Sequence, residues 1–299
     1  MRRPGRPTFD ILPGRIHHGH VHPLTVAREV AADLGLDARH AVVLRETGST
    51  VVDLAPAPVV ARVWPAGRRD LDVVRRELAV TSYLAHVGAP VAAPWTVAGP
   101  HERQGLVVTL WWRVDHDPDR PLDGAAAGRA LREVHDHLTD HDGVGLPHFA
   151  RLDEVRAVVA TLDLAPAEAA DLDEAIALAE VAVAGLDVRL QPVHGDAWLG
   201  NVLRAPGGPV WSDFERLCLG PRELDLTCNE TAARSRGRRP EDDAFLVGYG
   251  DHDAALRDRL APLELLPLAA WTYQLAASQP AYLDLARTRL AWALAGLCG

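Results

Sequence analysis

The sequence contains no lysine, and all 31 of its basic residues are arginine. An arginine guanidinium is planar and presents a rigid fork of donors. A lysine ammonium is a compact charge on a flexible stem, so the two residues do not substitute freely for each other. The absence of lysine therefore excludes a catalytic lysine from any mechanism that this protein uses.

Cysteine and long apolar runs are also scarce. Cys218, Cys228 and Cys298 are odd in number and share no CxxC spacing, so neither a disulfide framework nor a zinc site is indicated. No run approaches the 18 or more consecutive apolar residues that read as a membrane helix, and the opening MRRPGRPTFD has no apolar segment behind its basic residues. These absences predict a cytoplasmic protein without a membrane partner.

The net charge of −10 disfavours nucleic acid as a partner. Nucleic-acid binders need a basic surplus to neutralise phosphates, and this chain has the opposite balance. An acidic surface is compatible with a cationic small molecule, although acidity also serves solubility alone.

Length and composition indicate a folded protein of two parts. Hydrophobic residues make up 48% of the 299 residues and charged residues 24%, which is ordinary for a globular protein. A chain of this length is long for one core. We expect an α+β protein with a first lobe over residues 1–112, including a Pro-, Gly- and His-rich N-terminal arm, and a helical lobe over residues 113–299.

The first lobe has the pattern of a small antiparallel sheet with helices. Helical periodicity marks residues 24–36 and 70–87. Short β-branched runs separated by turn residues predict strands. These strands are expected at residues 41–46, 49–55, 58–64, 95–98 and 105–112, with a charged turn at 101–105 between the last two.

The second lobe is expected to be mainly helical, apart from one stretch of very short strands and tight turns, LQPVHGDAWLGNVLRAPGGPVWSDFE. The helices are predicted from their 3.6-residue period and their flanking turn residues. They are expected at residues 122–139, 152–161, 167–186, 223–234, 240–249, 263–278 and 280–297.

The non-helical stretch carries a set of residues suited to phosphoryl transfer. Asp196 lies five residues ahead of Asn201, and Asp213 follows after a Gly-Gly-Pro turn. Such chemistry needs an aspartate that accepts the proton of the attacking hydroxyl, and an amide oxygen and a second carboxylate that hold Mg²⁺ at the triphosphate. Hard oxygen ligands of this kind suit Mg²⁺.

These segments, VHGDAWLGN, WSDFE and GPRELDL, resemble those of the aminoglycoside phosphotransferase family, which is related to the eukaryotic-type protein kinases. The resemblance extends loosely over nearly the whole chain. It implies a protein-kinase-like bilobal fold, a monomer, and a nucleoside triphosphate, ATP or GTP, as co-substrate. The short distance from DFE to GPRELDL leaves no room for the activation segment of a protein kinase.

The resemblance also assigns roles to individual residues. Asp196 corresponds to the catalytic base, and Asn201 and Asp213 correspond to the Mg²⁺ ligands. His194 is implied as a supporting loop residue. Asp225 is similar to a buried structural aspartate that bonds the catalytic loop from the following helix.

On the nucleotide side, the family uses a strand lysine paired with a helix glutamate. Arg62 stands at the position of that lysine, and Glu77 lies 15 residues on, in the predicted helix. An ordinary surface pair is the alternative. Ser49 and Thr50 lie in the loop placed like the family's phosphate-covering loop, where hydroxyl and N–H groups can cap phosphates, although a plain hairpin turn also explains this loop.

The hinge between the lobes is expected at residues 109–112. There the main-chain groups of Leu110 and Trp112 would hydrogen-bond the adenine base, as the resemblance implies. The two adjacent tryptophans also fit a core position at the lobe interface.

The acceptor pocket is expected on the helical lobe. Candidate residues are Trp198, Glu215, Glu230 and the stretch 271–274. Carboxylates beside an aromatic face suit an aminated sugar or a quaternary ammonium group, but the helical spacing of Trp271 and its neighbours favours core.

Three functions stay open at this point. The first is a kinase of an aminoglycoside or amino sugar, and the second is a kinase of another metabolite alcohol such as choline, homoserine or a sugar. The third is a non-catalytic kinase-like module that binds a nucleotide as a regulator. The presence of Asp196, Asn201 and Asp213 favours an enzyme, and the missing lysine is the one feature that favours the third.

Overall fold

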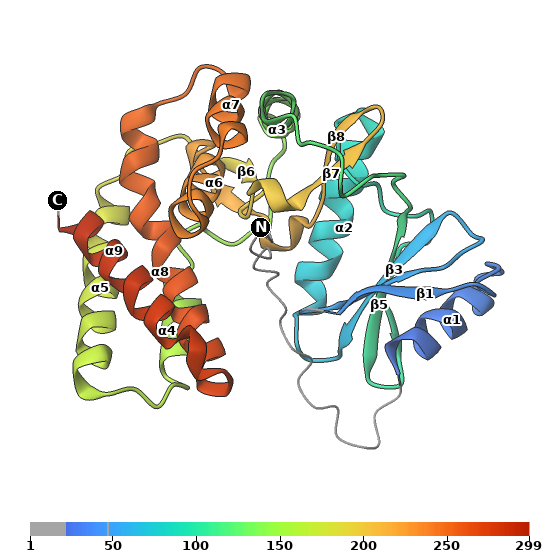
Figure 1. Cartoon of the computed structure of the whole chain (residues 1–299), viewed down its shortest axis with the longest axis horizontal. Coiled ribbons are helices and arrows are strands. Elements are labelled where there is room, and N and C mark those ends of the chain that lie inside the picture. The colour runs from blue at the N-terminus through green and yellow to red at the C-terminus, as the bar shows by residue number, and fades with distance from the viewer. Residues whose placement is uncertain (1–21, 47, 299) are drawn as a thin grey trace, which may run out of the picture. The chain divides into compact units, whose positions relative to one another are not determined.

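The described residues of this computed structural model, 22–46 and 48–298, divide into two compact units (Figure 1). The units comprise Met1–Ser82 with Ala92–Val114, and Tyr83–Val91 with Asp115–Gly299. The expected N-terminal arm falls mainly on residues 1–21, outside the described part. The lobe boundary expected between residues 112 and 113 stays a prediction.

The first unit is built on a five-stranded antiparallel sheet with the order β1-β2-β3-β5-β4. Helix α1 packs on this sheet through Val26, Ala27 and Val30, which are fully or almost fully buried against strand side chains that alternate in and out. The elements are α1 Pro23–Asp33, β1 Val42–Glu46, β2 Thr50–Asp53, β3 Val59–Pro65, α2 Leu71–His86, β4 His101–Arg103 and β5 Leu106–Trp112. The end of α2, from residue 83, belongs to the second unit.

The prediction of a strand at residues 95–98 is wrong. The strand that pairs with β5 on this side is β4, which lies where a turn was expected. Gln104 and Gly105 have φ values of 52° and 76° and connect β4 to β5. Positive φ at both central residues is typical of the two-residue turn that joins twisted strands. Trp95 and Ala98 still bond to β5 through Leu110, but they flank a turn at residues 96–97 and form no strand.

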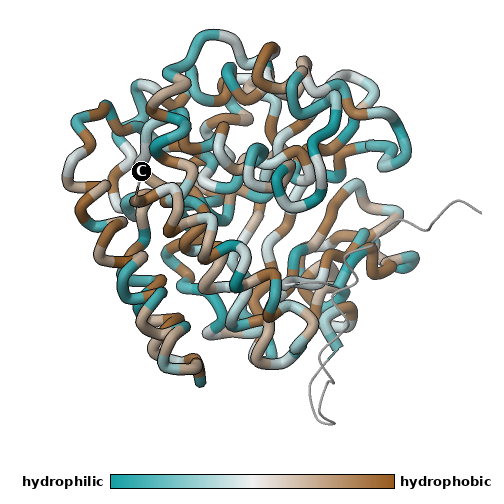
Figure 2. Tube along the Cα trace, turned by 60° about the vertical axis from the view of Figure 1, so that its left-hand side comes forward, coloured by the Kyte–Doolittle hydropathy of each residue, from teal (hydrophilic) through white to brown (hydrophobic). Residues whose placement is uncertain are grey.

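The second unit is mainly helical. Its short strands form two antiparallel pairs, β6 with β9 and β7 with β8. Hydrophobic and hydrophilic positions alternate along its helices (Figure 2). The elements are α3 Gly124–Leu138, α4 Leu152–Val159, α5 Pro166–Ala184, β6 Gln191–Val193, η1 Leu199–Asn201, β7 Val202–Ala205, β8 Gly208–Trp211, η2 Phe214–Arg216, β9 Cys218–Gly220, α6 Glu223–Arg236, α7 Pro240–Tyr249, α8 Ala254–Ser278, η3 Pro280–Tyr282 and α9 Leu283–Leu297.

Helix α8 begins nine residues before the expected position 263, and it contains Pro262 and Pro267. A proline inside a helix removes one backbone hydrogen bond, so the sequence favours a boundary there. Pro262 is buried, and a Cβ on Gly296 of α9 would lie 3.0 Å from the Pro262 Cβ, which shows how closely the two helices pack. Tertiary packing against α9 therefore outweighs the local cost of the proline.

The architecture confirms the expected α+β class. Helices α4, α5, α8 and α9 share one core of the second unit, in which Leu172, Leu260 and Leu266 are completely buried. Within the described part, no helix combines the length and the apolar character that a membrane span requires.

Candidate active site

The residues singled out as catalytic flank the β7–β8 hairpin of the second unit. Asp196 lies in the loop after β6, Asn201 ends η1, and Asp213 follows β8. The Ser212 N–H and Oγ both donate to the Asn201 main-chain oxygen, over 3.0 and 2.8 Å. These bonds tie the two ends of the hairpin together and bring Asn201 beside the residue that precedes Asp213.

The side chain of Asn201 is fixed by Asp196. Its Nδ2 donates to the main-chain oxygen of Asp196 over 2.9 Å and to Asp196 Oδ2 over 3.2 Å. The amide nitrogen therefore faces the loop, and the Oδ1 oxygen takes no part in either bond. An oriented carbonyl oxygen of this kind is a suitable ligand for a hard cation.

Asp196 is a half-buried carboxyl in a charged environment. Burial raises its pKa to about 8, the Glu264 and Asp213 carboxylates act in the same direction, and the Arg216 guanidinium and the Asn201 amide lower it. A carboxyl with a pKa in this range can exchange protons near neutral pH.

Asp213 adopts a backbone conformation that few side chains favour. Its φ and ψ of 69° and 55° lie in the left-handed region, which aspartate tolerates better than most residues. Such conformations cluster at functional sites.

The Asn201 and Asp213 oxygens fit a Mg²⁺ ion that takes its other ligands from water and phosphate. No group of three or more His, Cys, Asp or Glu residues that could hold a metal exists within the described ranges.

Asp225, on α6, holds the catalytic loop from behind. It is completely buried and accepts bonds from the N–H groups of His194 (2.8 Å) and Gly195 (2.7 Å). It also bonds His135 Nε2 over 2.8 Å, and His135 Nδ1 contacts the Tyr249 hydroxyl over 2.8 Å. The expected structural role of Asp225 is confirmed.

Gly195 and His194 shape this loop. Gly195 has φ of 75°, and a Cβ there would overlap the carbonyl oxygen of Arg216. His194 is buried with its ring against Phe214, and burial lowers its pKa. Because its Nε2 lies 3.1 Å from the Ser212 carbonyl, which can only accept, the neutral ring carries its proton on Nε2.

In the first unit, Arg62 and Glu77 meet as expected, and the pair is buried rather than superficial. Arg62 Nη1 lies 3.5 Å from Glu77 Oε1, with side-chain exposures of 13% and 3%. A second arginine, Arg69, contacts Glu77 Oε2 over 3.3 Å, and both guanidinium groups lie over the Trp64 ring. Glu77 therefore joins two arginines.

Ser49 and Thr50 are buried, and both contact residues of the neighbouring strand β3. Ser49 Oγ accepts a bond from Arg62 Nε over 3.2 Å, and Thr50 pairs with Val63 across β2 and β3. The loop and the arginine are thus linked directly.

The main-chain groups expected to bind adenine have other partners. Leu110 donates to Ala98 and accepts from Trp95, both over 2.9 Å, and the Trp112 N–H donates to Ala93 over 2.9 Å. The N–H groups of Leu110 and Trp112 are therefore engaged within the first unit, which corrects the expectation for these donors.

Three charged residues of the site were not predicted from the sequence. Arg69 lies seven residues after Arg62, beyond the end of the strand. Arg216 directly follows the DFE segment and donates from Nε to Gly195 O over 3.3 Å. Glu264 lies in an apolar part of α8, and burial raises its pKa to about 7. The carboxylate in an apolar helix was the available signal.

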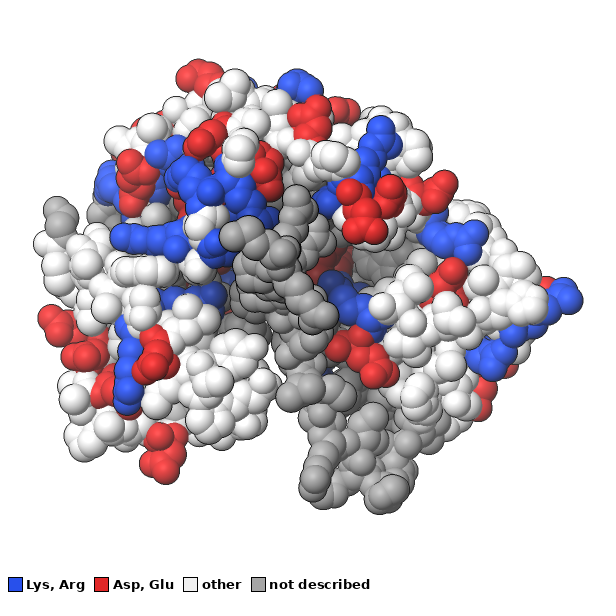
Figure 3. All heavy atoms as spheres, in the orientation of Figure 1, with Lys and Arg blue, Asp and Glu red and all other residues white. Residues whose placement is uncertain are grey.

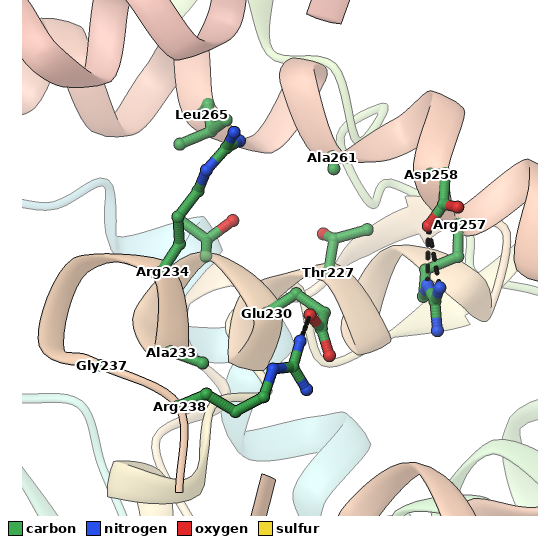
Figure 4. Close-up of a pocket in the computed structure, with 11 residues that line it drawn as sticks. Thr227, Glu230, Ala233, Arg234, Gly237, Arg238, Arg257, Asp258, Ala261 and Leu265 are labelled. Carbon is green, nitrogen blue, oxygen red and sulfur yellow. Dashed lines mark hydrogen bonds and ion pairs between the residues drawn. The ribbon is translucent and has the colours of Figure 1, made fainter. Parts of the chain in front are cut away.

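The helical unit contains a cavity of about 550 Å³ between α6, the α6–α7 turn and α8 (Figure 4). We call it the α6–α8 cavity. It is lined by Thr227, Glu230, Thr231, Ala233, Arg234, Gly237, Arg238, Arg257, Asp258, Ala261 and Leu265.

Of the acceptor candidates, Glu230 lines this cavity. Trp198 is 39% exposed. Thr272 and Tyr273 are buried, as the core interpretation predicts, but Trp271 is 47% exposed, so that interpretation is wrong for Trp271. Trp271 and Tyr273 lie two positions apart on α8, on different sides of the helix.

Solved structures share this fold. The amicoumacin kinase hAmiN, in complex with AMP-PNP, Ca²⁺ and Ami, is similar with a TM-score of 0.71 and 14% identity over 88% of this chain and 92% of its own. The choline kinase LicA from Streptococcus pneumoniae gives 0.67 and 15%, over 92% and 98%. The aminoglycoside phosphotransferase APH(3'')-Id from Streptomyces rimosus gives 0.55 and 20%, over 82% and 97%.

Fold and site together define a kinase-like small-molecule phosphotransferase. A model of the phosphotransferase enzyme family matches residues 32–263, and the chain belongs to that family. The resemblance noted in the sequence is confirmed, and the protein is a small-molecule kinase with a nucleoside triphosphate as co-substrate.

Proposed function

We propose that this protein transfers the γ-phosphoryl group of ATP or GTP, with Mg²⁺, to a hydroxyl of an aminoglycoside or amino sugar. The observation that carries the proposal is the bond of Asn201 Nδ2 to the Asp196 carboxylate, with Ser212 holding Asn201 next to Asp213. This arrangement joins a base and two oxygen ligands in one rigid unit.

In the proposed reaction, Asp196 orients the acceptor hydroxyl and takes its proton. The hydroxyl oxygen forms a bond to the γ-phosphorus, and the bond from that phosphorus to the β–γ bridging oxygen breaks, which releases the nucleoside diphosphate. Mg²⁺, when bound, neutralises charge on the triphosphate oxygens. Asn201 and Asp213 would hold it, because each presents a hard oxygen.

On the nucleotide side, we assign phosphate contacts to Arg62 and to the loop at Ser49 and Thr50, with Glu77 orienting the arginine. The bonds that link Ser49, Arg62 and Glu77 support this assignment. A guanidinium can hold two phosphate oxygens with parallel bonds, so arginine can perform the phosphate contact of the absent lysine with a different geometry.

The α6–α8 cavity is the proposed acceptor pocket. Glu264, whose charge acts on Asp196, lies between the lining residues Ala261 and Leu265 on α8. The volume of the cavity, about 550 Å³, lies within the range of drug-sized ligand sites. This size favours an amino sugar over choline or homoserine, which would fill little of it. A cytoplasmic location and a monomeric state stay predictions.

The test is nucleotide turnover with Mg²⁺ against a panel of aminoglycosides, amino sugars, choline and homoserine. We expect turnover stimulated by an amino sugar or aminoglycoside and reduced by about 10²–10⁴-fold in Asp196→Asn. Asp187→Asn is the matched control, because Asp187 is an exposed aspartate of the same unit. Acceptor-stimulated turnover that persists in Asp196→Asn would contradict the assigned base. Nucleotide binding with no turnover for any acceptor would favour the regulatory module.

A further inference from the structure

The α6–α8 cavity holds a cationic group without an anionic partner. Arg234 lines the cavity from α6, and its guanidinium lies 4.8 Å from the centre of the Trp292 ring. Across the described ranges, no carboxylate lies within ion-pair distance of Arg234. A guanidinium that stacks on an aromatic face keeps its N–H edge available for an anion. Figure 3 shows basic side chains gathered on the part of the second unit that contains α6.

The same cavity holds an acceptor atom without a donor. Glu230 Oε1 is buried and has no hydrogen-bond partner within residues 22–46 and 48–298. The other oxygen, Oε2, is bonded to Arg238, which is shared with Asp243 over 2.6 Å. One guanidinium therefore serves two carboxylates, and a buried carboxylate oxygen left without a donor is costly. A ligand that donates a hydrogen bond to Oε1 would remove this cost.

The other charged pair of the lining is complete. Arg257 and Asp258 are bonded to each other, with two Arg257 nitrogens 3.0 and 2.8 Å from Asp258 Oδ1 (Figure 4). Two groups of the lining are thus open to a ligand: Arg234, which is exposed and has no carboxylate partner among the described residues, and Glu230 Oε1, which lacks a donor there. Both residues belong to α6 and lie four positions apart, about one helical turn.

We propose that the α6–α8 cavity binds an acceptor that carries both an amine and an acidic group, with the acid on Arg234 and the amine on Glu230 Oε1. This inference rests on the proposed function, in which the cavity is the acceptor pocket. It narrows the amino-sugar class to acidic amino sugars and related zwitterions. The acid is a carboxylate or a phosphate, since both accept the paired N–H groups of a guanidinium.

Four hexose derivatives test the contact to the amine and the contact to the acid separately. Glucosamine carries only the amine, glucose 6-phosphate only the acid, and glucosamine 6-phosphate and muramic acid carry both, as phosphate and carboxylate respectively. Their dissociation constants would be measured by calorimetry without nucleotide. We expect glucosamine 6-phosphate or muramic acid to bind about tenfold more tightly than either single-function sugar, and the stronger of the two identifies the acid.

Two variants test which residue binds the acid and which binds the amine. Arg234→Gln should abolish the advantage over glucosamine, and Glu230→Gln should abolish the advantage over glucose 6-phosphate. Arg234→Lys keeps the charge and should keep most of the effect. Arg259→Gln is the control, because Arg259 is an exposed arginine of α8 outside the lining.

Equal binding of all four sugars, no binding at millimolar concentration, or an acid advantage that survives Arg234→Gln would each overturn the inference. The phosphotransferase proposal fails separately. In that case nucleotide turnover is absent or insensitive to Asp196→Asn, while the binding preference for sugars with both groups is unchanged.

Discussion

Glu77 is predicted to be the residue on which the arginine cluster of the first unit depends. It contacts Arg62 over 3.5 Å and Arg69 over 3.3 Å, and its side chain is 3% exposed. Glu77→Gln removes the carboxylate that the two guanidinium groups, 13% and 17% exposed, share. Removal of one partner from a buried ion pair costs about 3–5 kcal/mol. The contacts here are long and the Trp64 ring remains, so we expect about 3 kcal/mol.

The free energy of unfolding would be measured by urea titration. The matched control is Asp72→Asn, because Asp72 pairs with Arg75 over 2.7 Å on the same helix with both side chains exposed. Such exposed pairs contribute at most about 1 kcal/mol. A loss in Glu77→Gln no larger than in Asp72→Asn would refute the argument.

The same variant tests the proposed phosphate contact. If Arg62 binds the nucleotide phosphates equally in the ground and transition states, its misplacement in Glu77→Gln should raise the KM for nucleotide about tenfold and leave kcat unchanged. An unchanged KM in a folded variant would show that the cluster stabilises the fold but does not contact phosphate.

Two further predictions concern the second unit. Asp225→Asn places an amide among three donors, so we expect a loss of about 3 kcal/mol in unfolding free energy and a lower kcat; a lower stability with unchanged kcat would separate Asp225 from loop positioning. For Asp242, although burial opposes it, the bonds from Arg236 and from the Arg239 N–H lower its pKa below the ordinary value of 3.8. Its stabilisation is therefore present above pH 3.8 and lost as pH falls through the lowered value. The difference in Tm between Asp242→Asn and the unchanged protein should be constant from pH 7 to 5 and shrink below pH 4, and a difference that grows there would contradict this sign.

Much of the fold follows from periodicity, because the apolar positions of α1 and the alternation in β2 and β3 report the buried faces directly. Strand β4 was missed because His101, Glu102 and Arg103 are all polar and form an edge strand. The start of α8 was missed at Pro262, where packing on α9 decides the outcome.

The candidate site also contains residues that the sequence predicts and residues that it does not. Asp196, Asn201 and Asp213 are close in sequence, so their spacing was enough to propose them as the site. Arg69 and Glu264 act through partners that only the tertiary structure brings near, and no local pattern marks them. The engagement of the Leu110 N–H by Ala98 was equally invisible, because it depends on a turn that the sequence suggests to be a strand.

Helix α6 presents the support of the catalytic loop and the lining of the α6–α8 cavity on different faces. Asp225, which bonds the catalytic loop, and Thr227, which lines the cavity, differ by about 200° around the helix axis, and Arg234 differs from Asp225 by about 180°. Substitutions on the cavity face leave the hydrogen bonds of Asp225 in place. If the cavity binds the acceptor as proposed, acceptor preference can diverge during evolution through changes at Glu230 and Arg234, while the support of the catalytic loop is inherited unchanged.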